Sequence, residues 1–227
     1  MSRLEFLIFC QCHSNRAKPS SLKCSPTAEL QAHYFERDQM APLCLLYFSS
    51  IADHIRAGSI YSDKGGTVLK VEKVISHPKH VYLKTDYAVA LVFLEGHLEG
   101  SVSKQIGLAS SQDSYAPGVV GEVTGFKRPD ASSWSFGALQ ETNVTILSSE
   151  ECAGTFSPPI TEYTERMLCA NSPVGPDEGY CAFFGNLVVN NELVAIHNNG
   201  EPCQAPDSPS IYIKMLDVID WIKSYLN

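Results

Sequence analysis

The sequence lacks long hydrophobic runs and has little charge. No run of about eighteen consecutive apolar residues occurs, so we expect no membrane-spanning helix. Charged residues make up only 19% of the 227 residues and hydrophobic residues 44%, which excludes a disordered chain and indicates a packed core. The formal net charge is −8, so the chain has no excess of positive charge for binding nucleic acid or an anionic membrane. We therefore expect a globular protein with neither of these partners.

Eight cysteines are present, which is many for a chain of this length. The even number favours disulfides and an oxidising compartment, because cytosolic proteins keep their thiols reduced. Zinc binding is the alternative. However, Cys10 and Cys12 are separated by a single residue, and no second close pair has the spacing of a zinc site. We therefore expect disulfides, and no metal or other cofactor.

The N-terminus allows two interpretations. Met1–Arg3 precedes a short apolar run, as in a signal peptide, but Glu5 interrupts that run. The alternative is a first β-strand, without which a first sheet would have an exposed edge. The prediction of an extracellular protein therefore depends on the cysteines. In that compartment Asn143, which begins an Asn-Val-Thr triplet, is a candidate glycosylation site.

Short apolar or alternating segments dominate the rest of the chain, and turn-forming residues separate them. This pattern is typical of a β-sandwich or a β-barrel. Strands are expected at residues 67–75, 88–94, 119–124, 141–146, 185–189 and 193–196. A helix is expected at 217–226 with Asp217 as its N-cap, and a short helical turn from Ser148, because Ser148 and Glu151 have capping-box spacing. Residues 1–40 show weaker periodicity, and no element is predicted there.

Several short motifs follow one another in a specific order. They are Ile75-Ser-His-Pro78, Val123-Thr-Gly125, Ser148-Ser-Glu-Glu-Cys152, Arg166-Met-Leu-Cys-Ala170, Pro209-Ser-Ile-Tyr212 and Asp217-Val-Ile-Asp-Trp-Ile222. In this order the chain resembles the trypsin-like serine proteases. The resemblance implies an all-β chymotrypsin fold of two six-stranded antiparallel β-barrels with a C-terminal α-helix, the first barrel being degenerate at its N-terminus. It also implies a peptidase S1 domain at residues 24–227, preceded by a leader or a degenerate segment at 1–23.

The same resemblance implies how the cysteines pair. The expected disulfides are Cys24–Cys44, Cys152–Cys169 and Cys181–Cys203. Cys10 and Cys12 have no partner in the family.

Peptide cleavage in this family requires a serine, a histidine and a buried aspartate in mutual contact. The resemblance places Leu43 at the histidine position and Ala88 at the aspartate position, and neither side chain can accept a proton. The serine motif is shortened to Ala182, Phe183, Phe184 and Gly185, with no serine in it. Asp86 precedes Ala88 by two residues. On a regular strand it would share the face of Ala88 about 7 Å away, too far to orient an imidazole. His33 and His54 are expected to be solvated loop residues.

The specificity pocket of the family also differs here. The resemblance places Gly179 at the pocket floor, followed by the large ring of Tyr180. It also places Asn198 and Gly200 at the rim, and Ser210 where a pocket-wall glycine is usual. A filled or narrowed pocket and drift at an unused site are equally compatible with these residues.

The predicted function is therefore binding rather than catalysis. We expect a secreted serine protease homologue that acts as a decoy, competitor or cofactor in a proteolytic or innate-immune pathway. Its partners would be protease substrates, inhibitors or cascade proteases. Two alternatives remain open, namely an active serine endopeptidase with a rebuilt site and a relic without a selected role.

Overall fold

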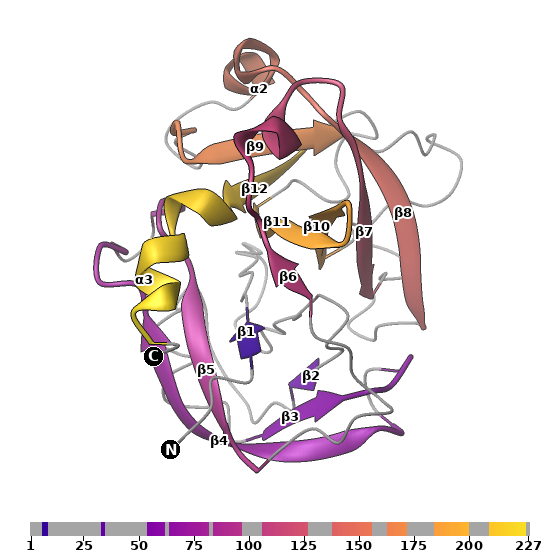
Figure 1. Cartoon of the computed structure of the whole chain (residues 1–227). Helices are drawn as coiled ribbons and strands as arrows, with labels where there is room; N and C mark the ends of the chain where they lie inside the picture. Colours follow the sequence, from indigo (N-terminus) through magenta and orange to yellow (C-terminus); the bar gives the residue numbers. More distant parts are fainter. Residues whose placement is uncertain are drawn as a thin grey trace, which may run out of the picture.

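The computed structural model describes residues 6–8, 33–34, 54–61, 64–81, 84–96, 106–126, 138–155, 163–171, 184–199 and 209–225. These residues form two β-sheets, one built from the first half of the chain and one from the second half (Figure 1). Among the described residues, none of the helices combines the length and apolar composition needed to cross a membrane.

The first sheet has five antiparallel strands in the order β1-β5-β4-β3-β2. Its strands are β1 (Phe6–Ile8), β2 (His33–Tyr34), β3 (His54–Ala57), β4 (Thr67–Ser76) and β5 (Ala90–Glu95). Strand β5 is a near-continuous apolar run whose first five residues are buried, as expected for a strand covered on both faces. Phe6–Ile8 pairs with β5 from Val92 to Ala90, so β1 covers the edge that a missing first strand would have exposed.

The second sheet closes into a barrel. Its strands are β6 (Gly107–Leu108), β7 (Val120–Phe126), β8 (Leu139–Ile146), β9 (Met167–Asn171), β10 (Phe184–Val189), β11 (Glu192–Asn199) and β12 (Ser210–Lys214). The order β10-β7-β8-β9-β12-β11 is completed by pairing of β10 with β11, which gives six strands without an open edge. The β10–β11 connection is a tight turn at Asn190 and Asn191, whose φ angles of 50° and 62° match the primed turns of two-residue hairpins.

The six strands of the closed ring are antiparallel, as predicted, whereas the additional strand β6 runs parallel to β11. This two-residue strand lies between the two sheets in chain order and is added outside the closed ring of six. Because it is not part of a hairpin, it need not reverse direction relative to its neighbour. The six predicted strands all occur, although β5 begins at Ala90 rather than at residue 88.

One apolar core joins the two sheets. Val89, Leu91 and Phe93, at and before β5, belong to the same cluster of buried side chains as residues of the second barrel. The barrel contributes Leu187, Ile196, Ile213, Met215 and Ile222, among others. Truncating one such buried side chain to alanine costs about 2–5 kcal/mol, so this shared core fixes how the sheets pack.

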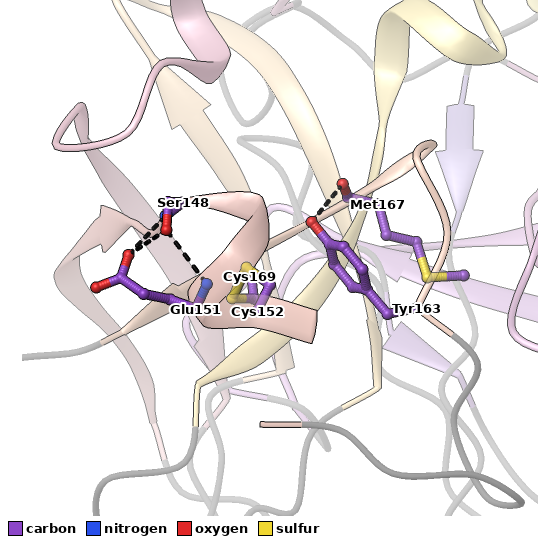
Figure 2. Close-up of a disulfide and its surroundings, with 6 residues drawn as sticks. All are labelled: Ser148, Glu151, Cys152, Tyr163, Met167 and Cys169. Atoms are coloured by element: carbon purple, nitrogen blue, oxygen red, sulfur yellow. Dashed lines mark hydrogen bonds between the residues drawn. A yellow bond between two sulfur atoms is a disulfide. The ribbon is translucent and has the colours of Figure 1, made fainter. Parts of the chain in front are cut away.

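Helix α2 (Ser149–Thr155) begins with the predicted capping box. The backbone N–H of Ser148 donates to Glu151 Oε2 at 2.9 Å, and the N–H of Glu151 donates to Ser148 Oγ at 3.2 Å (Figure 2). The same helix places Cys152 against Cys169 of β9, and the predicted disulfide between them is confirmed, with a Cα–Cα distance of 5.7 Å. The capping box therefore fixes where α2 begins, and the disulfide holds the helix against β9.

The C-terminal helix is shorter than predicted. A 3₁₀ turn at Met215–Asp217 precedes α3 (Ile219–Lys223), and Val218 stands at the N-cap without a side-chain hydrogen bond. The prediction of Asp217 as N-cap is therefore wrong, because the backbone N–H of Val218 bonds to Met215 O and closes the 3₁₀ turn first. The apolar face of the predicted helix is correct in part, since Val218 and Ile222 are buried.

Candidate functional site

The segment before β5 contains Ala88, which the family resemblance places at the position of the catalytic aspartate. This segment is a turn and not an extended strand, since Tyr87 has a φ angle of 53°. The N–H of Val89 donates to Tyr87 O at 2.7 Å, and the N–H of Tyr87 donates to Asp86 Oδ1 at 3.1 Å. The prediction that Asp86 and Ala88 share one face of a strand is therefore wrong. A left-handed non-glycine residue is strained and persists only where its surroundings hold it.

The carboxylate of Asp86 binds Arg166, which immediately precedes β9 in the second barrel. Arg166 Nε donates to Oδ1 at 2.9 Å and Nη2 donates to Oδ2 at 2.6 Å, a two-point ion pair. Both side chains are largely buried, with 24% and 25% of their surface exposed. The hydrogen bonds that Arg166 donates to Asp86 are the main reason that the pKa of Arg166 is raised. The ion pair between Asp86 and Arg166 thus joins the two barrels.

Tyr87 lies between cationic and aromatic groups. The guanidinium of Arg166 lies 4.8 Å from the centre of its ring, and the imidazole of His77 stacks on the ring at 4.6 Å. The indole of Trp221 in α3 meets His77 edge-on at 4.7 Å. These contacts hold the strained turn and connect it to the C-terminal helix.

His77 is held in its neutral form. Burial, followed by the positive charges of Lys79 and His80, lowers its pKa to about 4, although Asp86 acts in the opposite direction. Its Nδ1 accepts a hydrogen bond from the backbone N–H of Lys79 at 3.2 Å, so the remaining proton is on Nε2. A neutral imidazole packed between two rings is a structural group in this position.

The other histidines differ in exposure and contacts. His80 Nδ1 lies 3.2 Å from Asp86 O, and burial lowers the pKa of His80. Among the described residues, the contacts of His77 and His80 include no serine hydroxyl. His54 is exposed as expected but lies in β3 rather than in a loop, and the backbone of His33 lies in β2.

A polar cluster that the sequence analysis missed lies inside the second barrel. Asn186 of β10 and His197 of β11 are 2% and 4% exposed, and the backbone N–H of His197 donates to Asn186 Oδ1 at 3.4 Å. The His197 ring meets the ring of Tyr212 edge-on at 5.2 Å, and burial raises the pKa of Tyr212. The sequence signal for this buried cluster is the presence of an asparagine and a histidine in otherwise apolar strands. Ser210, predicted at the pocket wall, is partly buried at the start of β12.

Asn198, predicted at the pocket rim, makes a second polar contact between the barrels. Its Nδ2 donates to the backbone oxygen of Thr85 at 2.7 Å. Thr85, Asp86 and Tyr87 therefore all contact side chains of the second barrel. We call the contacts of these three residues with Asn198 and Arg166 the cross-barrel contacts.

Gly185 is the described end of the shortened serine motif. A Cβ atom at this position would lie 2.4 Å from Val123 Cγ1 and 2.5 Å from Thr124 O of β7. Glycine is therefore required by the close approach of β7 to β10, independently of any catalytic role. The backbone of Phe184 begins β10.

The remaining predicted site residues lie outside the described residues. They are Leu43, Gly179, Tyr180, Ala182, Phe183 and Gly200, together with Cys10, Cys12 and the disulfides Cys24–Cys44 and Cys181–Cys203. Within the described ranges, no group of three or more His, Cys, Asp or Glu side chains is placed to bind a metal ion.

Comparison with known proteins agrees with this architecture. A family model described as Trypsin matches residues 46–222. The chain belongs to the trypsin family. It is 31% identical over 171 residues to Trypsin 5G1 of Aedes aegypti, covering 74% of this chain and 64% of that relative. It is 26% identical over 181 residues to the Vitellin-degrading protease of Bombyx mori, covering 79% of this chain and 68% of that relative. The chain thus spans about two thirds of the length of these curated relatives.

A solved structure confirms the fold. Neuropsin, a serine protease expressed in the limbic system of mouse brain, superposes with a TM-score of 0.65 at 23% sequence identity, covering 77% of this chain and 79% of that chain. The trypsin-family member described here therefore has the predicted chymotrypsin fold, with a closed six-stranded barrel and a short C-terminal helix.

Proposed function

We propose that this trypsin-family chain is a serine protease homologue without peptidase activity, which acts by binding other proteins. The proposal rests mainly on Asp86, the acidic side chain nearest to the aspartate position, whose carboxylate is bound by Arg166 at 2.6–3.1 Å. Ala88, at the position itself, has no group that could orient a histidine or stabilise its protonated form.

Recruiting Asp86 as a substitute acid would cost the ion pair. Arg166 would lose its main partner in a site where both side chains are three-quarters buried, and leaving a charged group there without its partner costs about 1–3 kcal/mol. Tyr87 would also have to leave the contacts with His77 and Arg166 that hold its left-handed backbone. We therefore do not expect a rebuilt catalytic triad at the cross-barrel contacts.

Binding is therefore the function that we propose for the region between the barrels. The cross-barrel contacts hold the two barrels together, and a surface that is already ordered loses less entropy on binding. The partners would be protease substrates, inhibitors or cascade proteases, with the chain acting as a decoy, competitor or cofactor outside the cell. The confirmed Cys152–Cys169 disulfide fits that compartment.

An active serine endopeptidase is the second candidate, because several relatives are named trypsins. A labelling experiment separates the two functions. The folded chain is incubated with a fluorophosphonate probe and with a p-nitrophenyl ester, beside an active trypsin as the positive control. We expect neither labelling nor a burst of ester hydrolysis. Labelling that a serine protease inhibitor blocks would refute the proposal.

Binding is tested separately. The purified chain is added to an active protease, a protein substrate and a protein inhibitor of that protease, and the cleavage rate is followed. A decoy should raise the rate by sequestering inhibitor, and a competitor should lower it by sequestering substrate. A rate that stays unchanged at every chain concentration would favour the relic instead.

A further inference from the structure

We propose that Asn143 is the acceptor of an N-linked glycan, and that this glycan covers the outer face of β7 and β8. The inference shares with the proposed function only the assumption that the chain enters the secretory pathway. Asn143-Val144-Thr145 is the only Asn-x-Ser/Thr triplet without proline in the whole sequence.

The fold presents this triplet outward. Val144 is buried in the apolar core of the second barrel, so the alternation of a strand directs Asn143 and Thr145 to the opposite face. Asn143 is exposed on that face. Within the described residues, β9 pairs with β8 only at Thr145 and Ile146, which leaves the strand edge beside Asn143 without a neighbour.

Two side chains of β7 lie within reach of a sugar attached to Asn143. Glu122 of β7 stands directly opposite Asn143, and Val120 stands opposite Thr145. Val120, the first residue of β7, is an apolar side chain that is 58% exposed. A diagonal cross-strand neighbour lies about 7–8 Å away, within reach of the first sugar rings. A glycan on Asn143 would therefore lie over Glu122, which is directly opposite, and reach Val120 on the diagonal.

The position also lies away from the cross-barrel contacts. Figure 1 shows β8 on the side of the second barrel away from β5 and α3, whereas the cross-barrel contacts lie beside β5. A glycan there would shield the outer face of the barrel from association without hindering a partner bound beside the cross-barrel contacts.

The modification is a group transfer from a lipid-linked oligosaccharide. A bond forms between Asn143 Nδ2 and C1 of the first N-acetylglucosamine, and the bond between that carbon and the lipid pyrophosphate breaks. The pyrophosphate leaves with the bonding electrons, and the amide nitrogen loses one proton. The Thr145 hydroxyl is the part of the triplet that the transferase recognises.

The test uses the full chain with a cleavable secretory leader and a C-terminal tag containing one reporter acceptor triplet, translated in the presence of microsomes. We expect two glycosidase-sensitive mobility shifts for the wild type, and a single shift for N143Q and T145A. T145S should keep both shifts, and N171Q, which lies in no triplet, is the matched control. A wild-type chain with the reporter glycan alone would overturn the proposal.

The covering of Val120 is tested on the purified glycoprotein. Enzymatic removal of the glycan should increase the aggregation rate of the wild type, measured by light scattering. The V120T variant should show a smaller increase, because the uncovered side chain is then polar. Equal rates before and after deglycosylation of the wild type would show that the glycan does not shield this face.

Discussion

Acidification should destabilise this protein through His77. The imidazole is 6% exposed between the rings of Tyr87 and Trp221, and its pKa is lowered from 6.5 to about 4. Between these two values the unfolded chain binds a proton that the folded chain does not bind. The free energy of unfolding therefore rises with pH across this window and falls as the pH is lowered.

The magnitude follows from the same two pKa values. Lowering the pH from 7.5 to 5 should reduce the free energy of unfolding by about 2 kcal/mol through this group alone. Protonation would place a charge in a buried site, where the positive charges of Lys79 and His80 also oppose it. His80, whose pKa is also lowered, adds to the pH dependence in the same direction.

The assay is equilibrium unfolding in urea, followed by tryptophan fluorescence, at pH 7.5 and at pH 5. The matched variant is H77F, which keeps an aromatic ring in the stack and removes the proton site. Lys79 is an exposed residue, so water can replace His77 Nδ1 as the acceptor for its N–H in that variant. The loss of stability at pH 5 should be about 2 kcal/mol smaller in H77F than in the wild type. The same loss in both proteins would refute the reasoning.

Three further predictions concern the site and its support. In a double-mutant cycle of D86N and R166Q, each single change should lower the free energy of unfolding by about 1–3 kcal/mol. The loss in the double mutant should be clearly smaller than the sum of the two single losses. Purely additive losses, measured by urea unfolding, would contradict a coupled pair. Replacing Cys152 and Cys169 by serine should cost about 3 kcal/mol, since the bond spans 17 positions, and an unchanged thermal midpoint would refute this. The A88D variant should still show no fluorophosphonate labelling, because a carboxylate alone supplies neither base nor nucleophile, and restored labelling would revive the active endopeptidase.

Local patterns in the sequence predicted much of the fold. The capping box from Ser148 to Glu151 depends on residues three positions apart, and the buried run of β5 is a property of consecutive residues. Both could be predicted because their partners are close in the chain. The Cys152–Cys169 bond was predicted by family resemblance and not by the number of cysteines, which allows many pairings.

The candidate site was harder to predict, because its contacts join residues far apart in the sequence. Asp86 and Arg166 are 80 positions apart, and Asn198 reaches Thr85 across 113 positions. The turn at Tyr87 has no local signal, since a tyrosine with positive φ is stabilised by its neighbours in space. A strand pattern was therefore extended through residues that form a turn.

The apolar cluster that includes both Leu91 and Ile213 has a thermal consequence. Among the described residues, Val89, Leu91 and Phe93 would lose their packing if the second barrel melted, because they belong to the same buried cluster. Heating should therefore produce one calorimetric peak for the two halves of the chain together, and the temperature of that peak should report the integrity of either half.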